Sequence, residues 1–130
     1  MSMVVVICGG RNYPIFREKY EYKWLNELKE KYDIIEVVSG NASGADSWGE
    51  AWAKFIAKVD ITIMPANWEK HEKAAGMIRN ERMRYYLEMC KRMRSVDIAI
   101  LAFAGSNGTR DMISRAKLAN ISVFEYKEII

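Results

Sequence analysis

The sequence predicts an α/β protein: a single Rossmann-like, three-layer domain with about five parallel strands and helices on both faces of the sheet. Short runs rich in β-branched residues alternate with longer segments whose apolar residues recur at helical spacing. The loops between them are short, which is typical of βαβ units with right-handed crossovers. The 130 residues contain no internal repeat, low-complexity tract or linker, so we expect one domain over residues 1–130.

The first half of the chain is predicted to form three strands and two helices. Residues 4–8 are continuously apolar, as expected of a strand covered on both faces. Residues 34–38 and 61–64 are two further apolar runs, the second of which is closed by a proline. Residues 17–31 and 45–57 have the apolar periodicity of helices. In the first of these helices the apolar positions are Tyr20, Trp24, Leu25 and Leu28.

The second half is predicted to add two helices and two strands. Residues 66–69 form a loop, and residues 72–94, which contain no proline, form the longest helix. Residues 97–103 are expected to be the fourth strand, residues 109–119 the last helix and residues 121–124 the fifth strand.

Composition narrows the class of protein. Half of the residues are apolar and 28% are charged, which is typical of a folded soluble domain. No apolar run is long enough to span a bilayer and no signal peptide is recognisable, so we expect a cytoplasmic protein with no membrane partner. Cys8 and Cys90 are then expected to be reduced thiols. Together with His71 they form no plausible zinc set, so we expect neither a metal nor a cofactor.

The net charge of +3 is concentrated in the longest helix. Residues 70–94 contain eight Lys and Arg against three Glu, so this segment carries +5 and the rest of the chain −2. The first part of the segment carries Arg79, and its far end carries Lys91, Arg92 and Arg94. The two ends are about 20 Å apart along the helix axis. A small ligand that binds near Arg79 therefore cannot also contact the far end.

In open parallel sheets, ligands bind beyond the carboxyl ends of the strands. In this chain, the glycines and polar residues that are candidates for a ligand site come directly after the predicted strands. The first strand is followed by Gly9, Gly10 and Arg11. The glycines allow a sharp turn close to a ligand, and the guanidinium presents several donors to a phosphate or carboxylate. The alternative is an ordinary turn with a surface arginine.

The loop after the second strand is made of small residues and leads into a helix. Such a loop exposes backbone N–H groups at the positive end of the helix, where anions bind. Asp46 is either an N-cap or first-turn acid of the helix, or it accepts hydrogen bonds from a ribose. The expected ligand-binding residues here are Ser39, Gly40, Gly44 and Asp46.

The region after the third strand adds an aromatic ring and two polar side chains. Trp68 either stacks on a base or covers the edge of the core. Gly76 lies within a helical pattern, where glycine costs about 1 kcal/mol relative to alanine, so it suggests a close approach by another group. The neighbouring Arg79 and Asn80 either face the ligand or are solvated.

A second glycine-rich loop follows the fourth strand and opens the last helix, for which Thr109 is a candidate N-cap. Two such loops on neighbouring strands favour a nucleotide or phosphate site. The expected ligand-binding residues of this loop are Gly105, Ser106, Gly108 and Thr109.

Taken in order, these residues resemble the SLOG superfamily, the Rossmann-like group that includes the Lonely guy and DprA proteins, and within it the YspA-like branch. The resemblance covers nearly the whole chain and implies a five-stranded Rossmannoid domain that binds a nucleotide or nucleotide-derived ligand. The matching pieces are Gly10-Arg11 with Tyr13, Ser39-Gly40 through Gly44-Ala45-Asp46, Asn67-Trp68, Ala75-Gly76 with Arg79-Asn80, and Gly105 through Gly108-Thr109.

The chain departs from the Lonely guy phosphoribohydrolases at their Pro-Gly-Gly-x-Gly-Thr-x-x-Glu motif. Ala104 stands in place of the proline, and Met112 stands at the glutamate position. Asp111 is one residue early and would point about 100° away on a helix. The phosphate-binding glycines are kept, so the resemblance supports binding more than hydrolysis.

Three functions follow from these observations. The first is binding of a nucleotide or ADP-ribose-like ligand, as a sensor or sequestering protein. The second is N-glycosidic hydrolysis of nucleoside monophosphates, with Asp46, Glu69 or Asp111 stabilising an oxocarbenium-like state. The third is single-stranded nucleic-acid binding through the basic helix with Tyr85 and Tyr86. We also expect a homo-oligomer, because Met and aromatic residues are numerous and favour interfaces.

Overall fold

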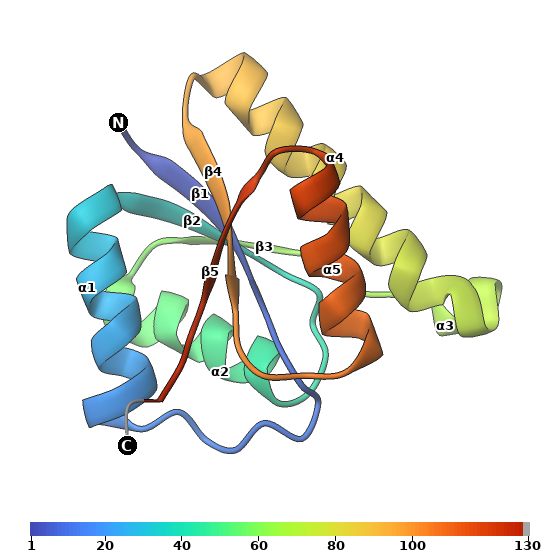
Figure 1. Cartoon of the computed structure of the whole chain (residues 1–130), viewed down its shortest axis with the longest axis horizontal. Coiled ribbons are helices and arrows are strands. Elements are labelled where there is room, and N and C mark those ends of the chain that lie inside the picture. Colours follow the sequence, from blue (N-terminus) through green and yellow to red (C-terminus); the bar gives the residue numbers. More distant parts are fainter. Residues whose placement is uncertain (129–130) are drawn as a thin grey trace.

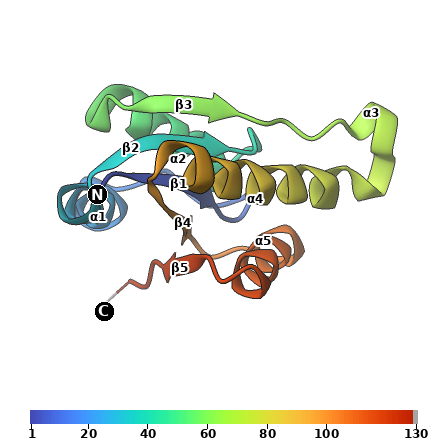
Figure 2. The same cartoon turned by 90° about the horizontal axis from the view of Figure 1, so that it is seen from above.

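The computed structural model describes residues 1–128 and contains a five-stranded sheet in which all neighbouring strands are parallel. The strand order is β3-β2-β1-β4-β5, so β3 and β5 form the two edges (Figure 2). The strand order reverses between β1 and β4, and the crevice beyond their carboxyl ends is where such sheets bind ligands. The prediction that the loops after the second and fourth strands leave neighbouring strands is wrong, because β1 lies between β2 and β4. The strands are β1 (Met3–Cys8), β2 (Ile34–Ser39), β3 (Asp60–Ile63), β4 (Asp97–Ala102) and β5 (Ser122–Glu125).

Helices cover both faces of the sheet. On one side lie α1 (Lys23–Tyr32) and α2 (Ala45–Ala51), and on the other lie α4 (Ala75–Arg94) and α5 (Asn107–Leu118) (Figure 1). The short helix α3 (Trp68–His71) projects from this body. The structure therefore confirms the predicted three-layer α/β architecture.

The sheet separates two apolar cores, because successive side chains of a strand point to opposite faces. In β1, Val4 and Val6 belong to the core beneath α4 and α5, whereas Val5 and Ile7 belong to the core on the side of α1 and α2. All four side chains are inaccessible or nearly so. The continuous apolar run of β1 is thus explained by burial on both faces.

The helix tryptophans pack against the core on one face of the sheet. Trp52 is fully buried, and its indole N–H donates to the side-chain oxygen of Asn26 at 2.8 Å. Trp24 and Trp48 are half-buried against the same core. The expected homo-oligomer therefore gains no support from these three residues and stays a prediction.

The first helical region differs from its predicted periodicity. Residues 18–22 form a π-helical segment before α1, and this wider turn changes which side chains face inward. Tyr20, expected on the apolar face, is exposed, and its neighbour Glu21 is fully buried instead. The structure thus corrects the sequence prediction at these two positions.

The last two helices begin at positions other than those predicted. Residues 72–74 form a 3₁₀ turn, so α4 begins at Ala75, and the predicted loop before it contains α3. Helix α5 has Ser106 at its N-cap position, with no side-chain cap hydrogen bond. Thr109 therefore lies within the first turn and is not the N-cap.

A buried carboxylate attaches α4 to the edge of the sheet. Glu36 of β2 accepts hydrogen bonds from Thr62 of β3 at 2.8 Å, from Tyr86 of α4 at 2.5 Å and from Arg94 of α4 at 2.6 Å. Burial alone would raise the pKa of Glu36, but these three donors outweigh it and hold the pKa below its ordinary value. This contact fixes the orientation of the helix that carries Arg79.

The Tyr86→Phe variant should unfold more easily than the native protein. It removes one donor to a buried carboxylate, and hydrogen bonds to charged groups contribute about 1.5–3 kcal/mol. Chemical denaturation measures the loss. The adjacent Tyr85 is exposed, so Tyr85→Phe is the matched control and should leave stability unchanged. Equal stability of the two variants would contradict the role given to Glu36.

Candidate functional site

A cavity of about 960 Å³ opens beyond the carboxyl ends of β1 and β4. Its walls come from the loops after these two strands, from the start of α2 and α5, and from one face of α4. Most of the residues predicted to bind a ligand line it. They are Gly9, Gly10, Arg11, Asp46, Trp68, Arg79, Asn80, Gly105, Ser106, Gly108 and Thr109, together with Asp111.

The glycines of the two cavity loops allow the loops to touch each other. A Cβ atom on Gly9 would lie 2.9 Å from the Cβ of Phe103, and one on Gly105 would lie 2.8 Å from the amide nitrogen of Gly10. The backbone N–H of Gly10 donates to the carbonyl of Ala104 at 2.8 Å. Close approach between protein segments therefore explains these glycines without a ligand.

The loop after β2 is attached to the loop after β1 through a third glycine. Gly44 has φ of +73°, and a Cβ atom on it would lie 2.2 Å from the carbonyl oxygen of Gly10. The same oxygen accepts a hydrogen bond from the N–H of Ala45 at 3.1 Å, and the hydroxyl of Ser43 donates to the carbonyl of Arg11 at 3.2 Å. Only glycine satisfies both the backbone conformation and the space at position 44.

Arg79 reaches from α4 across the cavity to the end of β2. Its Nη1 donates to the carbonyl of Gly40 at 2.7 Å, and its Nε donates to the side-chain oxygen of Asn80 at 3.0 Å. Burial lowers the pKa of Arg79, and Arg11 lowers it further, while Asp46 opposes both effects. The guanidinium is thus held in place by two neutral oxygens, which leaves its charge available to an anion.

Asn80 joins α4 to the start of α5. Its side-chain N–H₂ donates to the carbonyl of Gly108 at 3.1 Å and to the carboxylate of Asp111 at 3.0 Å. Asp111 also accepts from Arg115 at 2.8 Å. The first residues of α5 line the cavity at the positive end of the helix dipole, a position that favours anions.

Asp46 is the buried carboxylate of the cavity. Burial raises its pKa to about 6, although a hydrogen bond from the N–H of Ala42 at 3.1 Å and the charge of Arg79 both act in the opposite direction. It lies in the first turn of α2, as one of the two sequence interpretations held. Burial, with Asp46 as the second cause, also raises the pKa of Cys8, so that thiol remains protonated at neutral pH.

Trp68 and Arg11 close the outer side of the cavity. The guanidinium carbon of Arg11 lies 4.9 Å from the centre of a ring of Trp68, within range of a cation–π interaction. Trp68 is about half exposed and belongs to neither apolar core. This position fits contact with a ligand better than coverage of the core. A Cβ atom on Gly76 would lie 3.7 Å from Trp68, so the protein itself does not require glycine there.

The conformation of the loop after β1 is held by a second buried carboxylate. Glu21 accepts hydrogen bonds from the hydroxyl of Tyr13 at 2.8 Å and from the backbone N–H of Arg17 at 2.9 Å. The Tyr13 ring packs edge-on against Phe16 and Phe103. Tyr13 also lines the cavity, so this network positions one of its walls.

Four predicted site residues lie outside the cavity lining. The buried Ser39 hydroxyl donates to Glu50 at 2.6 Å, and Gly40 and Gly44 shape the surrounding loops. Glu69 is exposed and lines a neighbouring groove instead. Of the three proposed catalytic acids, Asp46 therefore has the most buried position in the cavity.

Several cavity residues were missed by sequence reasoning. Lys73, Met77 and Met83 line the cavity beside Gly76 and Asn80. Lys73, Met77, Asn80 and Met83 follow one another at intervals of four, three and three residues, a spacing that predicts one face of a helix. The sequence analysis assigned only Arg79 and Asn80 of this region to the ligand site. The other missed lining residues are Cys8, Asn12, Tyr13, Ala42, Ala104 and Asn107.

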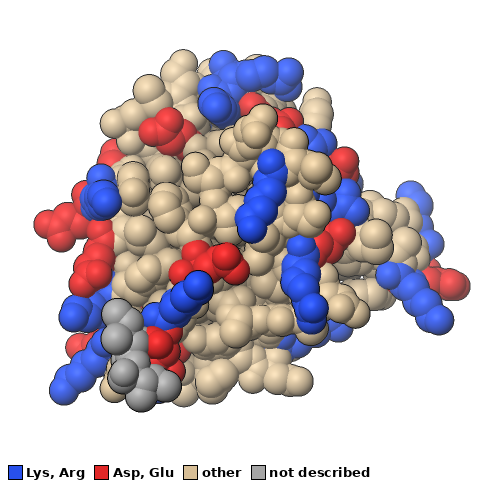
Figure 3. Space-filling view, in the orientation of Figure 1, with Lys and Arg blue, Asp and Glu red and all other residues tan. Residues whose placement is uncertain are grey.

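The charges around the cavity favour an anion. Arg11, Lys73 and Arg79 line it together with two carboxylates, Asp46 and Asp111. Asp111 is paired with Arg115, whose guanidinium lies outside the lining. Elsewhere on the face seen in Figure 3, acidic and basic side chains are interspersed.

The basic charge of α4 is partly neutralised. Arg84 pairs with Glu81 at 2.5 Å and with Glu88 at 2.7 Å, and Arg94 pairs with Glu36. The hydroxyl of Tyr86 also donates to Glu36. These contacts reduce the positive charge that α4 presents to a nucleic-acid backbone.

Within residues 1–128, no helix combines the length and apolarity needed to cross a bilayer. In the same residues, His, Cys, Asp and Glu side chains form no group of three or more suited to hold a metal ion. Cys8 and Cys90 are both free and buried.

A parallel sheet with an arginine-bearing, glycine-lined cavity at its switch point defines a Rossmann-like domain with a candidate anion site. The chain belongs to the YspA, cpYpsA-related SLOG family, whose model matches residues 3–71. It is also 33% identical over 102 residues to the Gene 61 protein of Mycobacterium phage D29, with 75% of each chain covered. The resemblance drawn from the residues is thus confirmed at the level of the family. The family match includes the loops after β1 and β2 and Trp68.

The Gly44→Ala variant should lose roughly 3 kcal/mol of stability, because it combines a positive φ with a collision against the carbonyl of Gly10. Gly108→Ala is the matched control. No atom lies within 4 Å of a Cβ added at Gly108, and alanine is favoured in a helix, so this variant should be unchanged or up to about 1 kcal/mol more stable. Urea denaturation compares the two. A Gly44→Ala variant of native stability would overturn the account of the loop contact.

The Asp46→Asn variant should change the pH dependence of stability. The folded pKa of about 6 lies above the ordinary value of 3.8, so the folded state binds this proton more tightly. The contribution to stability is complete below pH 4 and is lost as the pH rises through 6. Relative to the native protein, the variant should gain roughly 3 kcal/mol between pH 4 and 7, as measured by denaturation at each pH. The exposed Asp60→Asn variant controls for net charge, and a pH-independent difference would contradict the raised pKa.

Proposed function

We propose that the protein binds a nucleotide or a nucleotide-derived ligand of the ADP-ribose kind, as a sensor or sequestering protein. The observation that carries the proposal is the placement of Arg79 beside the N-terminus of α5 in one cavity. A fixed guanidinium and unpaired helix N–H groups together form a phosphate-binding arrangement. Membership of the SLOG family supports the same ligand class.

The cavity also offers groups suited to a ribose. Asp46 has a carboxylate at the cavity wall with one backbone donor, and carboxylates accept hydrogen bonds from hydroxyl groups. Arg11 and Trp68 lie on the outer side, where they can close over a bound ligand. These groups suit a ligand that has an anionic group at one end and a sugar beside it.

Hydrolysis of an N-glycosidic bond is the second candidate function. The observation that favours it is the pKa of about 6 for Asp46, which allows this carboxyl to hold or release a proton near neutral pH. The test is release of free base from nucleoside monophosphates. Turnover that disappears in Asp46→Asn while binding persists would support an enzyme. Tight binding without turnover would support a binding protein.

Replacing Arg79 should weaken nucleotide binding. Arg79→Met keeps most of the side-chain length but removes the charge, and a lost charge-assisted hydrogen bond corresponds to roughly 10- to 100-fold in affinity. Isothermal titration with AMP and ADP-ribose measures the effect. Arg92→Met, on the exposed far part of the same helix, is the matched control and should bind like the native protein.

A second variant separates the loss of a ligand contact from a loss of structure. Arg11 is exposed, so Arg11→Ala should fold normally and still bind AMP and ADP-ribose more weakly. Unchanged affinity in both Arg79→Met and Arg11→Ala would contradict the proposed site. The absence of micromolar binding to either nucleotide would contradict the proposed function.

A further inference from the structure

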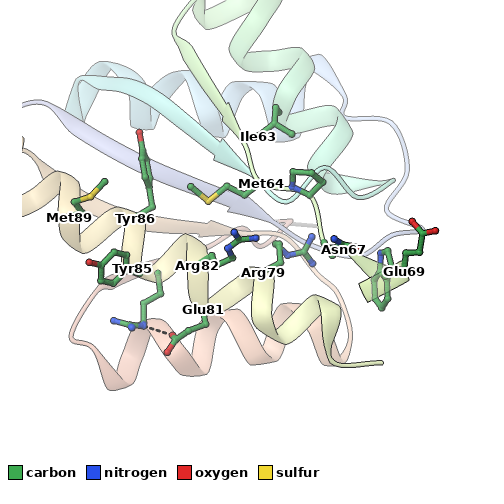
Figure 4. A pocket seen from close by; sticks show the side chains of 14 residues that line it. Ile63, Met64, Asn67, Glu69, Arg79, Glu81, Arg82, Tyr85, Tyr86 and Met89 are labelled. Carbon is green, nitrogen blue, oxygen red and sulfur yellow. Dashed lines mark hydrogen bonds and ion pairs between the residues drawn. The ribbon is translucent and has the colours of Figure 1, made fainter. Parts of the chain in front are cut away.

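We infer that a groove beside the cavity receives the planar base of the bound nucleotide. The inference rests on the proposed function, because it concerns the ligand whose phosphate would lie in the cavity. The groove has a volume of about 1030 Å³ and runs between the end of β3 and α4 (Figure 4). Ile63 and Met64 lie on its β3 side, and Tyr85, Tyr86 and Met89 lie on its α4 side.

The groove is continuous with the candidate phosphate site. Trp68 and Arg79 line both spaces, so two side chains form the boundary between them. Arg82 and Tyr85 follow Arg79 along α4 at about 5 and 9 Å, given a rise of 1.5 Å per residue. When the phosphate of a nucleotide is held beside Arg79, its base can therefore reach the groove.

The lining suits an uncharged, planar ring. The apolar side chains Ile63, Met64 and Met89 line the groove and offer surface that such a ring can cover. The ring of Tyr86 is held in position because its hydroxyl donates to the buried Glu36. A base stacked on such surfaces gains affinity with little dependence on its identity.

One cation of the groove is available to stack on the ring. Arg82 is exposed and forms no ion pair within the described part of the chain. A guanidinium stacks on planar aromatic groups and is more weakly hydrated than an ammonium group. The nearby Glu81 is paired with Arg84 at 2.5 Å and Arg115 at 3.5 Å, so two guanidinium groups offset its negative charge.

The methionine methyl groups provide reporters for both spaces. Met64 lines only the groove, Met77 lines only the cavity, and the exposed Met93 lines neither. The experiment is NMR of protein labelled with ¹³C-methyl methionine, with each signal assigned by a Met→Leu substitution. The full chain is titrated with ribose 5-phosphate, which has no base, and separately with AMP, GMP, CMP and UMP.

The expected result is that Met77 shifts with ribose 5-phosphate and with at least one nucleotide, whereas Met64 shifts only with a nucleotide. Met93 should shift with neither. Shifts at Met77 without any at Met64 would overturn the groove inference and leave the proposed function standing. The absence of shifts at every methyl group would contradict both.

A pair of variants tests the groove through affinity. Arg82→Ala should weaken binding of AMP about fivefold to tenfold more than it weakens binding of ribose 5-phosphate, because the stacking surface for the base is lost. Arg92→Ala removes the same charge from an exposed position of α4 that lines neither space. Equal losses in Arg82→Ala and Arg92→Ala, for both ligands, would overturn the assignment of the base to the groove.

Discussion

The carbonyl oxygen of Gly10 is the point at which the loops of the candidate site meet. It accepts hydrogen bonds from the backbone N–H groups of Tyr13 and Ala45, each at 3.1 Å, and so it joins the loop after β1 to the start of α2. The neighbouring N–H of Gly10 donates to Ala104, which joins the same loop to the segment after β4. Side chains larger than hydrogen at Gly9, Gly44 or Gly105 would separate these backbones. The walls of the cavity therefore depend on the close packing of three loops that are distant in sequence.

The charged groups of the site depend on this packing in turn. Arg79 reaches the carbonyl of Gly40 only because the loop after β2 is held at the cavity, and the charge of Arg79 offsets part of the cost of burying Asp46. Glu36 of β2 holds α4 through Tyr86 and Arg94, and so helps to position the helix that carries Arg79. Two buried carboxylates thus have different roles. Glu36 is satisfied by three donors and is structural, whereas Asp46 has one hydrogen-bond donor and faces the open space.

The sequence predicted the fold and most of the cavity because both follow from local patterns. Apolar runs and helical spacing mark the strands and helices, and a parallel sheet places the loops after all of its strands at the same edge. That the loops after β1 and β4 are neighbours follows from the strand order, which these patterns do not give. Long-range contacts were beyond this reasoning. The burial of Glu21 depends on a π-helical turn and on Tyr13 and Arg17, and the placement of Ser39 depends on a hydrogen bond to Glu50. Neither pairing has a signature in the spacing of residues.

The segment that corresponds to the phosphoribohydrolase motif differs from it at the glutamate position. Met112 occupies the position of the motif glutamate, and its side chain is buried in the core beneath α4 and α5. Asp111, one residue earlier, does line the cavity, but Asn80 and Arg115 occupy its Oδ2. The start of α5 thus lines the cavity, while its first acidic side chain, Asp111, accepts a hydrogen bond from Asn80 of α4. Of the three candidate acids, Asp46 at the start of α2 is the one that lines the cavity and accepts a hydrogen bond from the backbone alone. The candidate anion site at the start of α5 and the candidate acid therefore lie on different elements in this chain.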